Sequence, residues 1–178
     1  MSGQPTSATT IVGIKGRRVW DSRGRPTVEA DVTLEGGARG RAIAPAGASR
    51  GSREAVELRD GGTRFGGMDV LGAIDQVNHA IANALRGRDA RDQVAADLAL
   101  IALDATPNKA KLGGNATVAV SLAIAHAAAA ALEVPLWRHL ANGDAVSLPL
   151  PQLQIFGGGA HAGRRIDIQD LMVMPIGA

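Results

Sequence analysis

The chain lacks cysteine and has little aromatic content, with two tryptophans and two phenylalanines in 178 residues. The missing cysteine excludes disulfides, thiolate metal sites and cysteine nucleophiles, and it is compatible with a reducing cytoplasm. Few rings are available to stack on bases, and arginine is scattered, so the sequence indicates no nucleic-acid partner. Apolar residues make up 46% of the chain, and alanine is prominent among them, while glycine is also abundant. This composition predicts a globular core of small, closely packed side chains.

An excess of charge of one sign is also missing, because Lys and Arg number 19 and Asp and Glu number 17. The isoelectric point near 9.7 therefore reflects a difference of two charges and does not predict a basic face. Residues 1–10 contain neither a charged start nor an apolar block, so we expect a disordered tail and not a secretion signal. The run Val118–Leu132 contains Ser121 and His126 and is shorter than the roughly 20 residues of a spanning helix. It predicts a buried soluble helix and no membrane partner.

The first part of the chain alternates with the period of a β-strand. Ile11–Trp20 and Thr27–Leu34 read as two strands, and the turn-forming residues Asp21–Pro26 separate them. Glu35–Gly37 ends the second strand, and Gly40–Pro45 forms a third. Three antiparallel strands are the economical interpretation.

A loop of small residues follows these strands: Ala46, Gly47, Ala48, Ser49, Arg50 and Gly51. Glycine and serine let the backbone bend and expose its amides, so one interpretation is a mobile lid that closes on an anionic ligand. The alternative is an ordinary surface connection, since such residues are common in loops.

The middle of the chain has the period of helices. Asp69 is expected to cap a first helix, and Gly87 to end it. The apolar positions of this helix step by three and four: Val70, Ile74, Val77, Ile81 and Leu85. A second helix is marked by Val94, Leu98 and Ile101. A third, alanine-rich helix follows Asn115 and stops at Pro135, and Leu136–Leu140 forms a short helical turn.

Two short apolar runs close the chain, Leu148–Phe156 and Leu171–Pro175, and they predict a pair of strands around a glycine-rich turn. Three polar side chains cluster at this turn: His161, Gln169 and Asp170. A two-stranded ribbon is marginal by itself and needs far more protein around it. We therefore interpret the chain as the front part of something larger, with one domain over residues 11–145 and the start of a second over residues 146–178.

The sequence resembles the enolases in motifs that follow the order of that family. The opening signature is Val19-Trp20-Asp21-Ser22-Arg23-Gly24-Arg25-Pro26-Thr27-Val28-Glu29. Further matches are Gly47-Ala48-Ser49-x-Gly51, Glu57-Leu58-Arg59-Asp60, Leu103-Asp104-x-Thr106-x-Asn108-Lys109 and Leu112-Gly113-x-Asn115-Ala116. The last match is Gly158-Gly159-x-His161-Ala162-Gly163, followed by Gln169 and residues 172–178, and it is similar to the first strands of the enolase barrel.

The resemblance implies an α+β fold, in which a three-stranded antiparallel sheet packed with helices precedes the first strand pair of an incomplete β/α barrel. It implies the magnesium-dependent removal of water from 2-phosphoglycerate to give phosphoenolpyruvate, a cytoplasmic step of glycolysis. His161 and Asp170 are then the expected catalytic residues, and with Gln169 they bind the phosphorylated carboxylate substrate. The base lysine and the carboxylates that hold the first magnesium lie farther along the family's barrel than residue 178. The expected assembly is a homodimer, or association through exposed barrel strands.

Four positions depart from the family's pattern. In the lid motif a serine holds the second magnesium where this chain has Ala46, so no metal ligand is expected there, and the acidic residue after Gln169 is Asp170 where glutamate is usual. Gly157 replaces an asparagine, and Ala160 replaces a serine. The lost hydroxyl should weaken or reshape the metal site. These differences favour a diverged relative acting on another phosphorylated or phosphonate carboxylate, as carboxyphosphonoenolpyruvate synthases do. A non-catalytic interaction module is the third interpretation.

Overall fold

The chain forms two compact units. The computed structural model describes residues 7–47 and 51–177. The first unit is Met1–Ala46 with Arg53–Gly143, and the second is Gly47–Ser52 with Asp144–Ala178.

Residues 7–10 are the part of the predicted disordered tail that the structure describes, and they are ordered. Thr9 and Thr10 are buried, and their carbonyl oxygens accept hydrogen bonds from the N–H groups of Ala90 and Glu35 at 3.0 and 2.8 Å. The tail prediction is therefore wrong for these residues, because their backbone partners lie far along the chain, where a local pattern does not show them.

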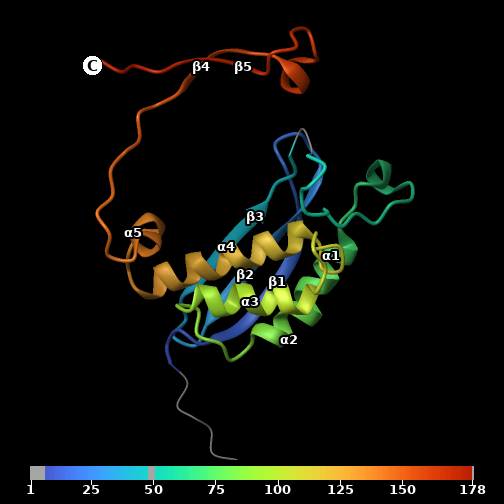
Figure 1. Ribbon diagram of the computed structural model, residues 1–178. Helices are drawn as coiled ribbons and strands as arrows, with labels where there is room; N and C mark the ends of the chain where they lie inside the picture. Colours follow the sequence, from blue (N-terminus) through green and yellow to red (C-terminus); the bar gives the residue numbers. More distant parts are fainter. Residues whose placement is uncertain (1–6, 48–50, 178) are drawn as a thin grey trace, which may run out of the picture. The chain divides into compact units, whose positions relative to one another are not determined.

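Three strands form the sheet of the first unit (Figure 1): β1 (Ile11–Trp20), β2 (Pro26–Leu34) and β3 (Arg39–Ala44). They are antiparallel in the order β1-β2-β3, which confirms the predicted sheet. Asp21 shapes the turn after β1 by accepting the N–H groups of Arg23 and Arg25 at 2.9 and 2.8 Å. Alternate side chains of β2 are buried against the helices: Val28, Ala30, Val32 and Leu34.

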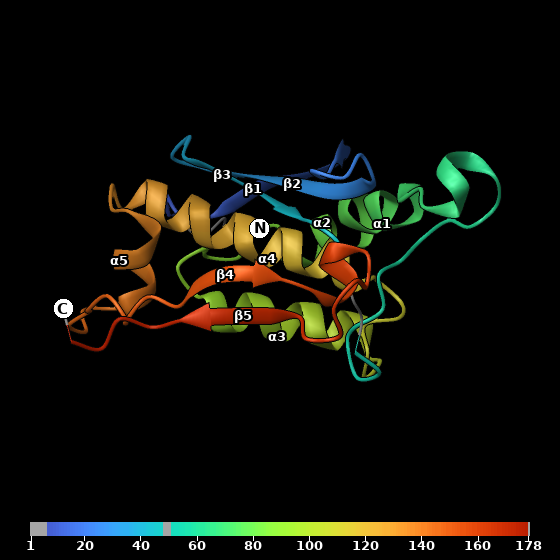
Figure 2. The same cartoon turned by 90° about the horizontal axis from the view of Figure 1, so that it is seen from above.

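The helices of the first unit lie on one side of this sheet (Figure 2). They are α1 (Leu71–Gln76), α2 (Ala82–Leu85), α3 (Gln93–Asp104), α4 (Gly114–Ala131) and α5 (Leu136–Ala141). A 3-10 turn, η1 (Arg64–Gly67), precedes α1, and a π-helical turn, η2 (Val77–Ile81), lies between α1 and α2. Helix α4 packs on β2 and β3, while α1, η2 and α2 pack on β1. Sheet and helices together confirm the predicted α+β class.

Asp69 does not cap the first helix, contrary to the prediction. Its buried carboxylate accepts two hydrogen bonds from Arg18, at 2.9 and 2.8 Å. Asp60 caps α1 instead, because its two carboxylate oxygens accept the N–H groups of Leu71 and Gly72 at 2.7 and 2.9 Å. The cap therefore comes from the far side of a loop, which the residues around position 69 do not reveal.

Helix α3 forms where it was predicted, but the residues that marked it lie outside the core. Val94, Leu98 and Ile101 are exposed, whereas Ala96 and Leu100 are buried. The buried residues belong to the side of α3 that faces other helices, and α3 packs against α4 and α2. The apolar period therefore located the helix correctly and misjudged which of its residues are covered.

Helix α4 approaches the sheet closely because both sides of the contact are small. A Cβ at Gly40 of β3 would lie 2.1 Å from the carbonyl oxygen of Ala123 and 2.2 Å from the backbone nitrogen of Ala127. Only glycine permits this contact. By length and composition α4 could also cross a membrane, but 67% of it is buried inside the protein, as in the core helix of a soluble domain.

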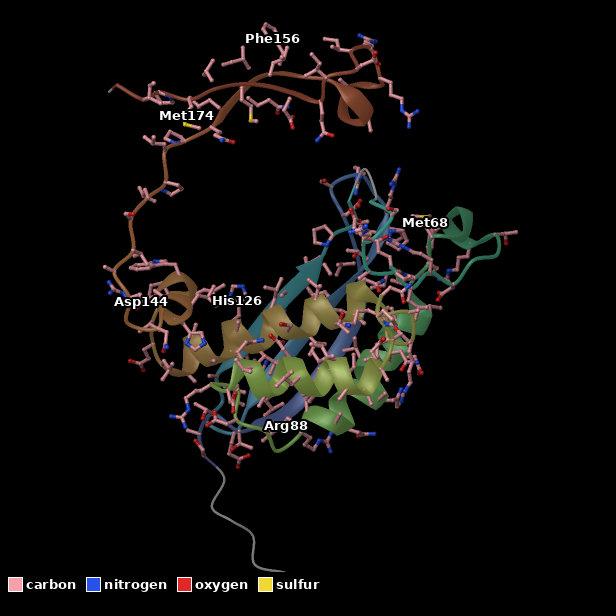
Figure 3. All side chains as sticks on the ribbon, viewed as in Figure 1. Met68, Arg88, His126, Asp144, Phe156 and Met174 are labelled. Carbon is pink, nitrogen blue, oxygen red and sulfur yellow. The ribbon has the colours of Figure 1, made fainter. Side chains whose placement is uncertain are left out.

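The second unit contains a strand pair with a 3-10 turn between its strands. The strands are β4 (Leu153–Gly157) and β5 (Asp170–Val173), which pair antiparallel, and the turn is η3 (Gly159–Ala162). The first strand was predicted to begin at Leu148 and begins later, since Pro149 and Pro151 have no N–H to donate to a ladder. Every residue of β4 and β5 is exposed, and side chains project from both sides of the pair (Figure 3).

Candidate functional site

Asp170, the predicted catalytic carboxylate, is the first residue of β5 and lies opposite Gly157 at the end of β4. Side-chain amides hold both of its oxygens. Gln154 Nε2 donates to Oδ1 at 2.5 Å, and Gln169 Nε2 donates to Oδ2 at 3.4 Å. The structure thus places two of the three predicted site residues, Gln169 and Asp170, in contact at one end of the strand pair. Both are exposed to solvent.

The glycine-rich turn brings the two strand ends together. A Cβ at Gly158 would lie 2.0 Å from the carbonyl oxygen of Ile168, so a larger residue would force the turn open. The N–H of Gly158 donates to the carbonyl oxygen of Gln169 at 2.7 Å, and the N–H of Gly159 donates to that of Ile166 at 2.7 Å. These bonds fix the backbone of Gln169 beside the turn.

His161 lies on η3, within the connection between the two site strands. Its side chain is outside the described part of the structure, so its predicted position beside the carboxylate stays a prediction.

The predicted lid begins at a residue that is tied to the turn after β1. Ala46 is 8% exposed, and its carbonyl oxygen accepts a hydrogen bond from Arg23 Nη2. Arg23 also forms an ion pair with Asp21 at 3.2 Å. Gly47 and Gly51 are exposed, and Ala48–Arg50 lie outside the described residues. The loop is thus anchored at its start to the Asp21-Ser22-Arg23-Gly24 part of the opening signature.

The carboxylate of Asp21, which pairs with Arg23, favours its charged form. A hydrogen bond from the N–H of Arg25 is the largest cause that lowers the pKa of Asp21. Burial opposes this change, and the N–H and guanidinium of Arg23 add to it. Asp21 therefore remains ionised at neutral pH and holds the Arg23 side chain that contacts Ala46.

A magnesium ion does not fit the described side chains by themselves. Among the described residues, no three Asp, Glu, His or Cys side chains gather in a way that could hold a metal ion. Magnesium prefers several oxygen ligands in near-octahedral geometry, whereas Asp170 supplies one carboxylate whose oxygens already accept two amides. Ala46 supplies no hydroxyl, and its carbonyl oxygen accepts Arg23.

Gln154 and Arg23 are site residues that the sequence reasoning missed. The alternation of Gln152 and Gln154 along the predicted strand was a usable signal, because in a strand it would place both amides on one side. The contact between Arg23 and Ala46 had no such signal, since it joins two loops that only the folded sheet brings together.

The first unit is an antiparallel α+β domain, and the second begins with a strand pair that carries an amide and a carboxylate beside a glycine-rich turn. The chain thus combines a mixed α+β domain with a short strand pair, which is consistent with a partial barrel. The family model for the enolase N-terminal domain matches residues 11–140, and the model for the enolase C-terminal TIM barrel domain matches residues 145–178. The chain belongs to the enolase family. Enzymes of this family are lyases that generally use magnesium, bind small phosphorylated substrates and often form dimers.

Proposed function

We propose that the chain is part of an enolase-type hydro-lyase that converts 2-phosphoglycerate to phosphoenolpyruvate and water, as a cytoplasmic step of glycolysis. The observation that carries the proposal is the match to both enolase domains, over residues 11–140 and 145–178. The contact between Gln169 and Asp170 at the end of the strand pair supports it, because an exposed amide and carboxylate there can meet a substrate.

The proposed roles follow from the chemistry of each side chain. Asp170 would exchange a proton with the departing hydroxyl, since its carboxylate is exposed and oriented by two amides. Gln169 would orient the substrate through its amide, and His161 would bind an anionic group of the substrate. The magnesium that we propose as cofactor needs ligands besides the described side chains.

A second candidate is a lyase of this family that acts on another phosphorylated or phosphonate carboxylate. The observation in its favour is the position of Asp170, whose short side chain is held next to the strand pair by Gln154 and Gln169. The side chain of aspartate reaches less far from β5 than that of glutamate. Asp170 would therefore select a substrate whose hydroxyl lies closer to the strand.

Residues 1–178 by themselves are expected not to dehydrate 2-phosphoglycerate, because the described residues gather no metal-binding carboxylates and the resemblance places the base lysine farther along the barrel. The assay is phosphoenolpyruvate formation, followed by ultraviolet absorbance, with purified chain, excess magnesium and substrate. A chimera in which residues 1–178 precede the rest of an enolase barrel tests the site. There we expect turnover, and a loss of about 10²- to 10⁴-fold on Asp170→Asn.

Asp167→Asn is the matched control, because Asp167 is an exposed carboxylate near β5 but outside it. Equal losses in the two variants would contradict the role given to Asp170. Faster turnover of a phosphonate analogue than of 2-phosphoglycerate would favour the second candidate. Turnover by residues 1–178 alone that disappears on Asp170→Asn would show that the catalytic groups are all within this chain.

A further inference from the structure

The pair Asn142–Gly143 lies where the first unit ends. Asn142 is the C-cap of α5, and Gly143 is the last residue of the unit. Residues 142–152 form neither helix nor strand, and all of them are exposed; Figure 1 shows this connection between α5 and β4. A backbone nitrogen that follows asparagine can attack the side-chain amide of that asparagine. Glycine shields its nitrogen least, because it has no Cβ.

The nitrogen of Gly143 is open to such a reaction. Within the part of the chain that the structure describes, neither its N–H nor the side-chain amide of Asn142 makes a hydrogen bond. A Cβ built on Gly143, whose φ is 91°, would meet no atom within 4 Å. Both reacting groups are therefore unbound and surrounded by open space.

The backbone of Asn142 leaves the two groups free to approach each other. Its φ of 48° and ψ of 37° lie in the left-handed region, which is unfavourable for a residue with a side chain. The N–H of Asn142 donates to the carbonyl oxygen of His139 at 3.2 Å. Rotation about the Cα–C bond of Asn142 keeps this hydrogen bond and swings the nitrogen of Gly143. Among the described residues, the rotation that cyclisation needs thus breaks no hydrogen bond.

The other four asparagines of the chain each precede a residue that has a side chain: Asn78, Asn83, Asn108 and Asn115. Three of these four lie within helices, where hydrogen bonds along the helix restrain the backbone. Asn142 combines a following glycine, an exposed position and an unbonded backbone.

We propose that Asn142 is a site of spontaneous modification in the folded protein, at which water converts the side-chain amide to a carboxylate through a cyclic imide. The nitrogen of Gly143 forms a bond to Cγ of Asn142. The bond from Cγ to the amide nitrogen breaks, and ammonia leaves with the proton of the Gly143 N–H. Water then opens the five-membered ring at either carbonyl, which gives aspartate or isoaspartate. One water is consumed and one ammonia is released, and nothing is oxidised or reduced.

The modification changes the connection between the two units. Either product adds a negative charge two residues before Asp144 and at the carboxyl end of α5, where the helix dipole is also negative. Isoaspartate also lengthens the backbone by one carbon. The inference is independent of the proposed lyase activity, because it uses no residue of the candidate site.

The test is incubation of the full chain at mildly alkaline pH, which favours the attacking nitrogen. Peptide mapping by mass spectrometry locates the modified residue, and an isoaspartyl methyltransferase with labelled S-adenosylmethionine detects isoaspartate. We expect modification at Asn142 at a rate that approaches that of an unstructured peptide of residues 138–148. Asn142→Gln should abolish it, since glutamine would need a six-membered ring. Gly143→Ala should slow it about tenfold, which is about 1.4 kcal/mol in the barrier.

Gly87→Ala is the matched control. Gly87 follows the C-cap of α2, has a φ of 84° and has no atom within 4 Å of a built Cβ, but the residue before it is Arg86. This variant should leave the rate at Asn142 unchanged, and equal slowing by both alanine variants would overturn the role of Gly143. Circular dichroism of each variant establishes that it is folded.

Two further outcomes would overturn the proposal. One is modification of Asn83, which is exposed on α2, to the same extent as Asn142, because general unfolding would then be the cause. The other is a rate about a hundredfold below that of the peptide, since the fold would then protect Asn142 by about 2.7 kcal/mol.

Discussion

At the scale of single residues, Asp104 shows how one buried carboxylate organises a loop. It is 1% exposed and accepts hydrogen bonds from the N–H and hydroxyl of Thr106 and, at 2.7 Å, from the N–H of Leu112. Burial by itself raises the pKa of Asp104, but these hydrogen bonds outweigh it and lower the pKa below its ordinary value. The fold therefore requires the charged form.

Asp104→Asn is expected to destabilise the first unit by about 2 kcal/mol at neutral pH, because one buried N–H loses its acceptor. The folded pKa lies below the unfolded one, so the stabilisation by Asp104 is fully present above the unfolded value of about 3.9. It is lost as the pH falls through the lower, folded pKa. Urea unfolding at about pH 7 and about pH 3 should therefore show a smaller difference between wild type and variant at the lower pH.

Asp75→Asn is the control for this experiment. Asp75 is exposed and, within the described residues, forms an ion pair with the exposed His79 alone, one helical turn away. Its replacement should therefore change the free energy of unfolding by less than about 0.5 kcal/mol. A loss of similar size in both variants, or a difference for Asp104→Asn that is independent of pH, would contradict the assigned role.

At the scale of elements, Asn78 joins the helical segment α1-η2-α2 to the outer edge of β1. Among the described residues, the strand order leaves one edge of β1 without a neighbouring strand. Asn78, on the π-helical turn η2, accepts the N–H of Gly16 at 2.8 Å and donates to its carbonyl oxygen at 3.3 Å. The Asn78 side chain thus makes the two hydrogen bonds to the Gly16 backbone that a neighbouring strand would make. Gly16 is required there, since a Cβ would lie 2.9 Å from Val77.

Asn78→Ala is expected to cost about 1–2 kcal/mol of unfolding free energy, because two partly buried backbone groups lose their partners. Asn83→Ala, an exposed asparagine of α2, is the matched control and should be neutral or slightly stabilising, since alanine is the better helix former. Thermal and urea unfolding measure both. Equal effects would mean that Asn78 acts through helix propensity and not through its bonds to β1.

At the scale of the whole molecule, the second unit differs from the first in how its apolar side chains are covered. The first has a continuous core of sheet and helix residues. In the second, the apolar residues of both strands are exposed, among them Ile155, Phe156, Leu171 and Met172. An exposed strand pair with apolar faces is a surface that favours association.

We predict that residues 1–178 self-associate through β4 and β5 and that these strands exchange amide hydrogen faster than β2. Ile155→Lys with Leu171→Lys should lower the apparent mass in analytical ultracentrifugation. Leu98→Lys, at an exposed apolar position of α3, is the comparison. If Leu98→Lys lowers the mass and the strand variants do not, association proceeds through the first unit, as in the homodimer that the resemblance suggests.

Much of the fold could be predicted because its signals are local. The alternation over Thr27–Leu34 indicated a strand with one covered face, and the sheet buries that face. The three-to-four spacing from Val70 to Leu85 indicated a helix, although the π-helical turn within it left no sign in that spacing. The motifs shared with enolases indicated the family, which the matches to both domains show.

The sequence by itself thus determined which segments are strands or helices and which family the chain belongs to, because periodicity and ordered motifs are properties of neighbouring residues. Only the tertiary structure decided that Asp60 caps α1, that Gln154 holds Asp170, and that Arg23 contacts Ala46. Each of these contacts joins residues that are far apart in the chain. Strand register and packing determine such distances, and in a strand pair a shift of one residue would turn every side chain to the other face.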